Sequence, residues 1–417
     1  MKAKEWQTME KKVFLKKAYN AVSKNKVSPF LNRLFFDLKH SLGVDNYTHW
    51  DVNSNSLTLI ITNHGLLVMS AALEIMDHYT DLSSLIFLQA CDNLKEKYIW
   101  SEQPKLNLRG KVDNKKLTLQ ALGDAILCGD TIKTIKIFEQ IQDINISLKP
   151  EIEDILYFMS IVSVEETTFR NARNLGHKAI ALEKTLGFVG RIPKLSQQFY
   201  RWFLRYLTSF PVIFPLYDRV SRNFDIDEKW ANNTGPFDER LFDTIYNTLY
   251  YRKGIITEVL NSLRNGYSIE SIRKSLFIST LKFLSERRLD TAFYMIHLLN
   301  YLHSSRLYFQ RHSTIRTVYA LLVQALYTEI IFDERGGSGS ETNADVSRST
   351  EEILKNLLKI DASANGGHNM KFVSTILDEK NHSPAWAVDH YLKAVDKVYR
   401  LNPKSFNVLE FYKNHYK

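Results

Sequence analysis

Four histidines, each at the head or in the middle of an otherwise apolar segment, are the residues of this chain best suited to chemistry. They lie far apart in the sequence, at His64, His177, His297 and His368. Imidazole is the usual nitrogen ligand for iron, copper and zinc. Four helices that each turn one imidazole toward a shared interior would form a metal site of the kind built into helix bundles. The alternative is that each is a buried histidine with an ordinary hydrogen bond.

Two further residues, Lys371 and His303, extend this pattern. Lys371 lies three residues after His368, so the two share one helical face. A lysine in an apolar interior is costly as an ammonium ion. Lys371 therefore either reaches solvent along its stem, acts as a neutral base, or carries a carbamate formed with carbon dioxide. His303 follows His297 by six residues, about 240° around a helix, so the two face one site only if that helix bends.

Several catalytic motifs are missing from the sequence. There is no Walker-type glycine loop, no GxGxxG after a strand, no HExxH and no G-x-S-x-G. The pair of Glu-x-x-His motifs that marks di-iron carboxylate bundles is also missing, since Glu379-x-x-His382 is the single match. Acids on the relevant faces are limited to Glu74, Asp77 and Glu166. The inventory therefore favours a mononuclear, nitrogen-rich site.

Composition is that of a globular protein of ordinary solubility. Of 417 residues, 44% are hydrophobic, 24% are charged and 12% are aromatic, with only 9 prolines and 16 glycines. The net charge of +9 is spread along the chain, which favours a solvated basic surface over a nucleic-acid or membrane site. Cys91 and Cys128 are too few for a disulfide framework or a thiolate zinc cluster, and each is expected to be buried. With neither a membrane-spanning run nor a signal sequence, we expect a cytoplasmic protein.

Helical periodicity runs through most of the chain and predicts one all-α domain over residues 1–417. We expect a helix from His64 to His78 capped by Asn63, and another that begins at Pro150. Residues 54–62 form the one candidate strand, or an extended approach to the next helix.

Two segments are expected to be irregular. Residues 209–237 contain three prolines and an Asn-Asn-Thr-Gly turn. Residues 333–350 are expected to be flexible, and the GGSGS run at 336–340 looks like an engineered linker.

The histidine segments, in their order along the chain, resemble the questin oxidase-like family. That family has an N-H at the start of an early helix, an H-x-h-I-R-like helix, an H-A-V-T-x-x-H-A-L-R-like helix and a terminal D-x-H-x-h-K segment. The counterparts here are NHGLL at 63–67, GHKAI at 176–180, IHLLNYLHSSR at 296–306 and GGHNMK at 366–371.

The third counterpart keeps both histidines six residues apart and the arginine, Arg306, that follows them. The departures are Lys178 and Ala179 in the second segment, Asn300 for threonine and Gly367 for an acid. His312, in QRHSTIRTVYA, also fits H-x-x-I-R loosely, but it falls out of order and is kept as a reserve.

The resemblance implies an all-α enzyme that oxidises aromatic polyketides such as anthraquinones, by Baeyer–Villiger-type oxygen insertion or ring cleavage. It implies a mononuclear non-haem iron, O₂ and a small aromatic substrate, with NADPH as a candidate reductant. Its metal ligands would be His64, His177, His297, His368 and a carboxylated Lys371, and the catalytic residues Lys371 and His303.

The residues themselves leave other functions open. A non-catalytic helical interaction or scaffold protein with a basic surface needs no site at all. Nucleic-acid binding is the weaker hypothesis, because no helix-turn-helix and no interleaving of aromatic and basic residues stand out.

For the oxygenase, the sequence offers further site residues. Asn63 and Asn300 are candidates to accept a hydrogen bond from the imidazole nitrogen that does not bind the metal, and candidate pocket aromatics are Phe169, Phe293, Tyr294 and Phe372. No oligomeric state is predicted.

Overall fold

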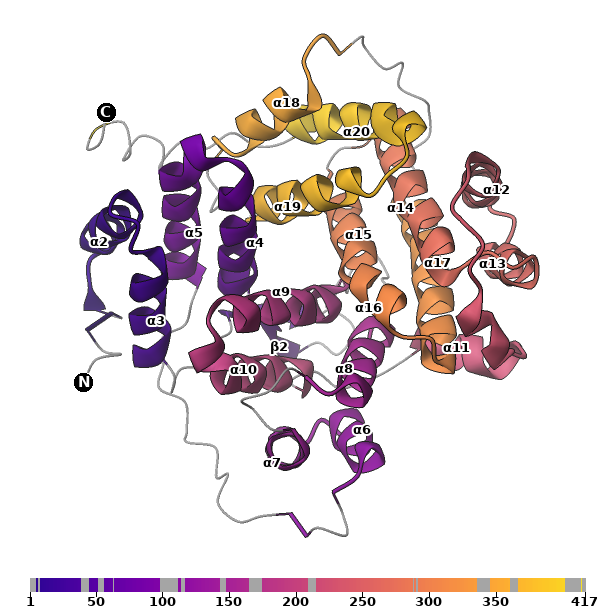
Figure 1. The fold of residues 1–417 in the computed structure, drawn as a ribbon, viewed down its shortest axis with the longest axis horizontal. Helices are drawn as coiled ribbons and strands as arrows, with labels where there is room; N and C mark the ends of the chain where they lie inside the picture. The colour runs from indigo at the N-terminus through magenta and orange to yellow at the C-terminus, as the bar shows by residue number, and fades with distance from the viewer. Residues whose placement is uncertain are drawn as a thin grey trace.

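Helices make up nearly all of the secondary structure in this computed structural model, which confirms the predicted all-α class (Figure 1). The described residues are 5–6, 8–38, 45–51, 56–62, 64–97, 112–113, 117–142, 148–164, 175–208, 215–287, 289, 292–335, 346–360, 367–401 and 414. The α-helices are α2 Lys11–Ser23, α3 Val27–Asp37, α4 His64–His78, α5 Ser83–Lys97, α6 Leu119–Leu127, α7 Thr131–Ile141, α8 Pro150–Val162, α9 His177–Arg191, α10 Ser196–Thr208, α11 Pro215–Asn223, α12 Glu239–Tyr250, α13 Ile255–Arg264, α14 Ile269–Glu286, α15 Phe293–Ser304, α16 Arg306–Arg311, α17 Ile315–Arg335, α18 Thr350–Leu357, α19 His368–Asn381 and α20 Val388–Leu401.

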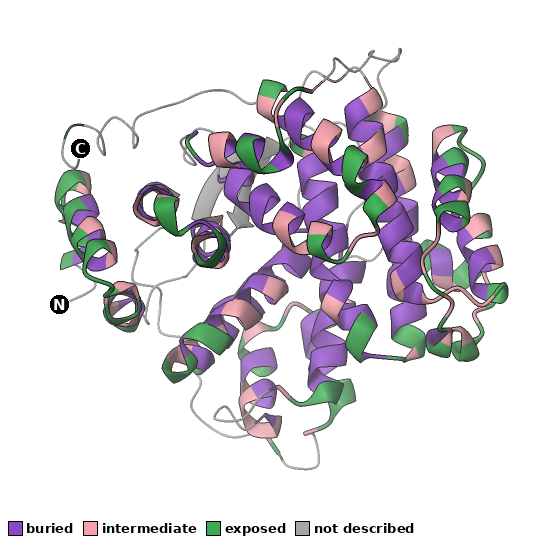
Figure 2. Cartoon of the chain, turned by 45° about the horizontal axis from the view of Figure 1, so that its top comes forward, coloured by how far each residue is buried: buried purple, intermediate pink, exposed green. Residues whose placement is uncertain are grey.

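Four of these helices form a closed ring at the centre of the molecule. Helix α4 packs on α9 and α19, and α15 closes the ring by packing on the same two helices. In Figure 1 they frame the centre, with α19 above, α9 below, α4 on the left and α15 on the right. We call α4, α9, α15 and α19 the four-helix ring. Figure 2 shows that its helices, together with α14 and α17, are mostly buried.

A short β-hairpin precedes the first ring helix. Strand β1 (Asp45–Asp51) pairs antiparallel with β2 (Ser56–Thr62), from Asp45 opposite Thr62 to Asp51 opposite Ser56. Of the candidate strand at 54–62, residues 56–62 thus form a strand, and residues 54–55 lie outside the described residues. Asn63, which was expected to cap α4, lies outside the described residues.

Two proline-led segments are helical. Helix α8 begins at Pro150, as expected, because a first helical residue needs no N–H donor. The expectation of an irregular 209–237 was wrong in part: α11 begins at Pro215 for the same reason, and a short 3₁₀ helix follows at Glu228–Asn232. Asp227 starts that turn by accepting a hydrogen bond from the Lys229 N–H.

The longest helix, α17, is a core element. Within the described part of the chain, its segment Ile315–Glu334 is the one helix long and apolar enough to cross a membrane. However, 72% of that window is buried against the rest of the protein, as is typical of a core helix. The helix ends at Arg335, so residues 333–335 are helical and not part of a flexible loop as expected. The GGSGS run at 336–340 lies outside the described residues.

The two cysteines differ in burial. Cys91 is fully buried in α5, as expected, and burial raises the pKa of its thiol well above the ordinary value. The expectation of a buried Cys128 was wrong, because this residue is exposed. Cys128 follows the last residue of α6, where the chain turns through Gly129 at the protein surface, so its side chain faces solvent.

Candidate metal centre

Each of the four histidines comes from a different helix of the four-helix ring. His64, His177 and His368 are the first residues of α4, α9 and α19, and His297 is the fifth residue of α15. Three of them are buried, and His64 is partly exposed. Helix starts therefore carry three of the imidazoles to one point, and the turn after the start of α15 carries the fourth.

The imidazoles converge, as the sequence predicted. One nitrogen of each lies within 4.8 Å of the others. The Nε2 atoms of His64 and His177 are 3.0 Å apart, and so are those of His297 and His368. Rings of adjacent members are 4.5–5.6 Å apart between centroids. We call these four residues the histidine cluster. It could hold a metal ion.

His297 has a fixed tautomer. Its Nδ1 lies 2.7 Å from the backbone carbonyl oxygen of Phe293, which can only accept. Nδ1 therefore carries the hydrogen, and Nε2 presents its lone pair to the cluster. Burial first, and then the positive charge that His368, His177 and Lys371 can carry, lower the pKa of His297 well below 6.5. This histidine is held neutral and ready to bind a cation.

Asn300 does not orient an imidazole, contrary to expectation. Its Oδ1 accepts a hydrogen bond of 2.8 Å from the Thr375 hydroxyl, which ties α15 to α19. The partner that orients His297 is a backbone carbonyl one turn earlier, which no side-chain pattern could reveal.

Two glycines make the close approach of the ring helices possible. Gly176 and Gly367 precede His177 and His368, and both have positive φ angles, of 77° and 75°. A Cβ on Gly176 would stand 2.5 Å from the ring of Tyr301, and one on Gly367 would collide with Val68. Glycine is needed at both positions for the backbone angle and for the contact.

Replacing Gly367 by alanine is expected to lower the free energy of unfolding by about 3 kcal/mol, from a left-handed backbone plus overpacking against Val68. Urea unfolding followed by circular dichroism measures this. Gly190→Ala, in α9, is the matched control, because no atom lies within 4 Å of its added Cβ and its φ is ordinary. We expect the control to be unchanged or up to about 1 kcal/mol more stable. Equal losses in both variants would contradict this account of Gly367.

Lys371 lies on the same face of α19 as His368 and is only 1% exposed. It therefore does not reach solvent along its stem, which removes one of the three alternatives. When Lys371 is protonated its charge lowers the pKa of His297, so the amine lies within electrostatic reach of the cluster. The neutral base and the carbamate remain as the two alternatives from the sequence.

One aromatic side chain, Phe293, lies against the cluster. Its ring is 4.3 Å from that of His297 and 4.9 Å from that of His368, between centroids, and it is 37% exposed. Tyr294 contacts Phe293 edge-on, and Phe372 is fully buried. Phe169 and Glu166, also named from the sequence, lie outside the described residues.

The electrostatic potential at the cluster favours anionic ligands on a metal ion bound there. Three helices begin at its histidines, and a helix start carries a partial positive charge. A metal ion held only by neutral imidazoles would add charge of the same sign. The centre therefore calls for anionic ligands, such as a carbamate, an ionised substrate or an oxygen species.

The other two histidines named from the sequence lie elsewhere. His303 is outside the cluster, with its Nδ1 3.0 Å from Glu379 Oε1, so His297 and His303 face different sites as their spacing indicates. His312 lies 3.4 Å from Glu153 Oε2 and is not a member of the cluster. Among the acids, Glu74 binds the buried Lys184 at 2.7 Å and does not belong to the cluster.

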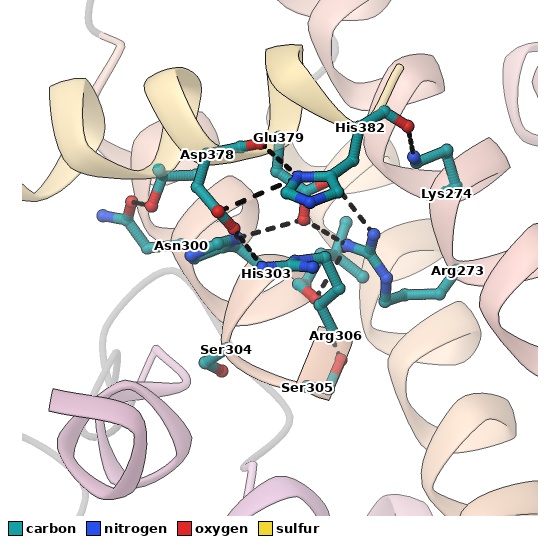
Figure 3. A network of polar contacts seen from close by, with 12 residues as sticks. Arg273, Lys274, Asn300, His303, Ser304, Ser305, Arg306, Asp378, Glu379 and His382 are labelled. Carbon is teal, nitrogen blue, oxygen red and sulfur yellow. Dashed lines mark hydrogen bonds and ion pairs between the residues drawn. The ribbon is translucent and has the colours of Figure 1, made fainter. Parts of the chain in front are cut away.

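A buried charged network beside His303 was not predicted (Figure 3). Arg273 is fully buried in α14 and binds Glu379 at 2.8 Å and Glu270 at 2.7 Å. Lys184, 2% exposed, binds Glu74 and Glu183. One signal was present: Arg273 lies four residues after Ile269 and four before Phe277, on an apolar face of its helix.

Comparison with known proteins adds no relatives. No protein-family model matches the chain, and neither a curated protein nor a solved structure is significantly similar to it.

Proposed function

We propose that this protein is a metal-dependent oxygenase that acts on an aromatic polyketide-like substrate through a mononuclear non-haem iron. The observation that carries the proposal is the histidine cluster, in which four imidazoles from four helices lie within 4.8 Å of one another. The short motifs that resemble the questin oxidase-like family supply the substrate class and the metal.

The donor set of the cluster is compatible with iron, because imidazole is a usual ligand of iron as well as of copper and zinc. The Nε2 atoms of His64 and His177 are 3.0 Å apart, and so are those of His297 and His368. These four residues would hold the ion through their ring nitrogens. The choice of iron among these metals rests on the family resemblance.

When bound, the iron would supply activation of O₂ for transfer to an electron-rich ring. The residues of this chain have separate tasks. His297, fixed by the Phe293 carbonyl, keeps its lone pair toward the ion. The Phe293 ring, beside His297 and His368, gives a flat apolar surface for an aromatic substrate. The three helix starts stabilise negative charge on substrate oxygen. Lys371, as a carbamate, would offer an anionic ligand.

The test is loading followed by turnover. Protein purified without chelators is analysed for metals, then reconstituted with Fe(II) without oxygen and mixed with a hydroxyanthraquinone in air, with and without NADPH. We expect about one iron per chain and oxygen uptake that depends on the substrate. His297→Ala should bind no iron and consume no oxygen, whereas His312→Ala, a buried histidine outside the cluster, should do both. An iron-free wild type after reconstitution contradicts the proposal.

A further inference from the structure

A second site lies within reach of the same four helices. A cavity of about 280 Å³ is lined by residues of α4, α9, α15, α16 and α19 and by none of the cluster histidines. Its lining includes Glu74, Glu183, His303, Arg306, Ser374 and Asp378. His303 is six residues beyond His297 on α15, a rise of about 9 Å. The volume is near the lower end of ligand pockets and suits a molecule of one or two rings.

His303 faces this cavity as a base. Its Nδ1 is 3.0 Å from Oε1 of Glu379, a carboxylate that is 0% exposed. Burial opposes ionisation of Glu379, but the charge of Arg273 and the hydrogen bond from His303 outweigh it and hold its pKa far below 4.5. An ionised carboxylate accepts, so Nδ1 carries the hydrogen and the lone pair lies on Nε2. A histidine oriented by a buried carboxylate is the arrangement that general bases use.

Arg273 completes this arrangement from behind. Its guanidinium donates to both oxygens of Glu379, at 2.8 and 3.1 Å, and to the carbonyl of Leu302, at 3.2 Å (Figure 3). It therefore fixes both the carboxylate and the end of α15 that carries His303. Arg273 and Glu379 are positioning residues, since neither lines the cavity.

Two buried groups of the cavity, His303 and Arg306, have hydrogen-bonding capacity to spare. His303 Nε2 is 3.8 Å from Glu183 Oε1, beyond hydrogen-bond distance. Arg306 is 8% exposed, and its Nη2 donates a hydrogen bond of 2.5 Å to Asp378 Oδ2. Its buried Nε has no hydrogen-bond partner within the described part of the chain. One acceptor and one cationic donor thus line the same cavity, which matches a hydroxyl that gives up its proton and keeps a negative oxygen.

The other charges of the cavity are already paired. Lys184 binds Glu74 and Glu183, Arg191 binds Asp77, and Arg306 binds Asp378. A cationic ligand would have to displace one of these partners. A carboxylate ligand would enter as an anion among four carboxylates. A neutral weak acid enters without charge, and if it passes its proton to His303 the net charge of the cavity does not change.

We infer that the cavity binds a phenol or enol and that His303 takes the proton of its hydroxyl group. The O–H bond breaks, its proton forms a bond to Nε2, and the electron pair stays on oxygen, where the positive charge of the Arg306 guanidinium stabilises it. Imidazole becomes imidazolium and the phenol becomes a phenolate, so charge balances without a co-reactant. The step needs no metal ion, and it extends the proposed function to a second, phenol-binding site.

The test uses para-nitrophenol, whose phenolate is yellow and whose phenol is colourless, with metal-free full-length protein in chelator. Absorbance is followed from acid to neutral pH with and without protein. We expect bound probe to ionise with an apparent pKa at least one unit lower, a tenfold shift. His303→Asn should remove the shift, and Arg306→Lys, which keeps the charge but loses the planar guanidinium, should weaken binding about tenfold.

Controls separate the base from its surroundings. His382→Asn is the matched control: this histidine also faces Asp378, at 3.8 Å, but is 47% exposed and does not line the cavity. It should behave as wild type. Glu379→Gln keeps an acceptor for His303 without the charge, so the probe's pKa should rise again by about one unit while binding persists. Circular dichroism verifies that each variant is folded.

Several other titratable or charged groups surround His303 and contribute to the pH dependence of the probe. They are Glu74 of α4, Glu183 and Lys184 of α9, Arg273 of α14, Arg306 of α16, and Asp378 and Glu379 of α19. An unchanged shift in folded His303→Asn overturns the inference. So does tighter binding of benzylammonium than of para-nitrophenol.

The metal proposal fails or survives separately. His297→Ala should keep the probe shift, since the assay contains no metal and the cavity excludes His297. A wild type that never loads iron but ionises the probe would overturn the oxygenase alone.

Discussion

Replacing Arg273 by methionine is expected to lower the free energy of unfolding by about 3–5 kcal/mol. The methionine keeps the length of the side chain and removes its charge. Glu379 then stays buried, at 0% exposure, without the guanidinium that donates to both of its oxygens. The loss is measured by urea unfolding at neutral pH.

The size of this effect comes from the stranded carboxylate more than from the lost hydrogen bonds. The double variant Arg273→Met/Glu379→Gln should therefore recover most of the loss, because it buries no uncompensated charge at this position. Arg222→Met is the surface control: its bond to Asp218 is 3.6 Å long and Arg222 is 78% exposed, so we expect a change of about 0.5 kcal/mol or less. A double variant as unstable as the single one would assign the loss to packing.

Acid should weaken the same network in the wild type. The pKa of Glu379 lies far below 4.5 in the folded protein and returns to that value on unfolding. Its contribution to stability is therefore complete above pH 4.5 and is lost as the pH falls below it, since the unfolded chain then takes up a proton that the folded chain refuses. Glu153 and Glu74, whose pKa values are also lowered, act in the same direction. In Glu379→Gln, the free energy of unfolding should decrease less steeply as the pH falls below 4.5.

The histidine cluster could be predicted because its residues break a local rule. An imidazole at the head of an apolar helix has no place in a simple packing pattern, and His64, His177 and His368 each stand there. Gly176 and Gly367 precede two of these histidines, and the structure shows that only glycine fits there, although Gly367 counted in the sequence as a departure from the family pattern. The sequence therefore contained the composition of the centre and the helices that form it.

The buried charged network could not be predicted because charged residues are normally exposed. Arg273 and Glu379 are 106 residues apart, and the apolar neighbours of Arg273 on its helix do not identify Glu379 as its partner. Their burial depends on how α14, α15 and α19 cross, which periodicity does not encode. The same holds for Lys184, whose partners Glu74 and Glu183 reach it from two helices. Long-range pairing decides such positions.

Adding a metal ion is expected to stabilise the protein strongly, and only when His297 is present. At a free concentration a thousand times the dissociation constant, binding adds about 4 kcal/mol to the free energy of unfolding. Co(II) serves as a probe that tolerates air. His297→Ala should show no gain, because it removes the one imidazole whose lone pair the Phe293 carbonyl directs to the cluster.

The matched control is His312→Ala. His312 is also buried, at 8% exposure, but its partner is Glu153 and it lies outside the cluster. Its loss should lower stability without changing the gain on adding Co(II). An equal gain in His297→Ala and the wild type would place the ion elsewhere.

The pH dependence of the metal-free protein gives the sign of the His297 contribution. Burial first, and then its neighbours, hold the pKa of His297 well below the 6.5 of the unfolded chain. Below pH 6.5 the unfolded chain binds a proton at this histidine that the folded chain does not. The free energy of unfolding therefore decreases as the pH is lowered, by up to about 1.4 kcal/mol per pH unit for this group. His297→Phe should lack this decline. In the wild type, the stability gained on adding Co(II) should also become smaller below pH 6.5, because imidazoles must be unprotonated to bind a metal. A gain that persists unchanged well below pH 6.5 and is lost only near pH 4 would contradict nitrogen ligation and favour a carboxylate site.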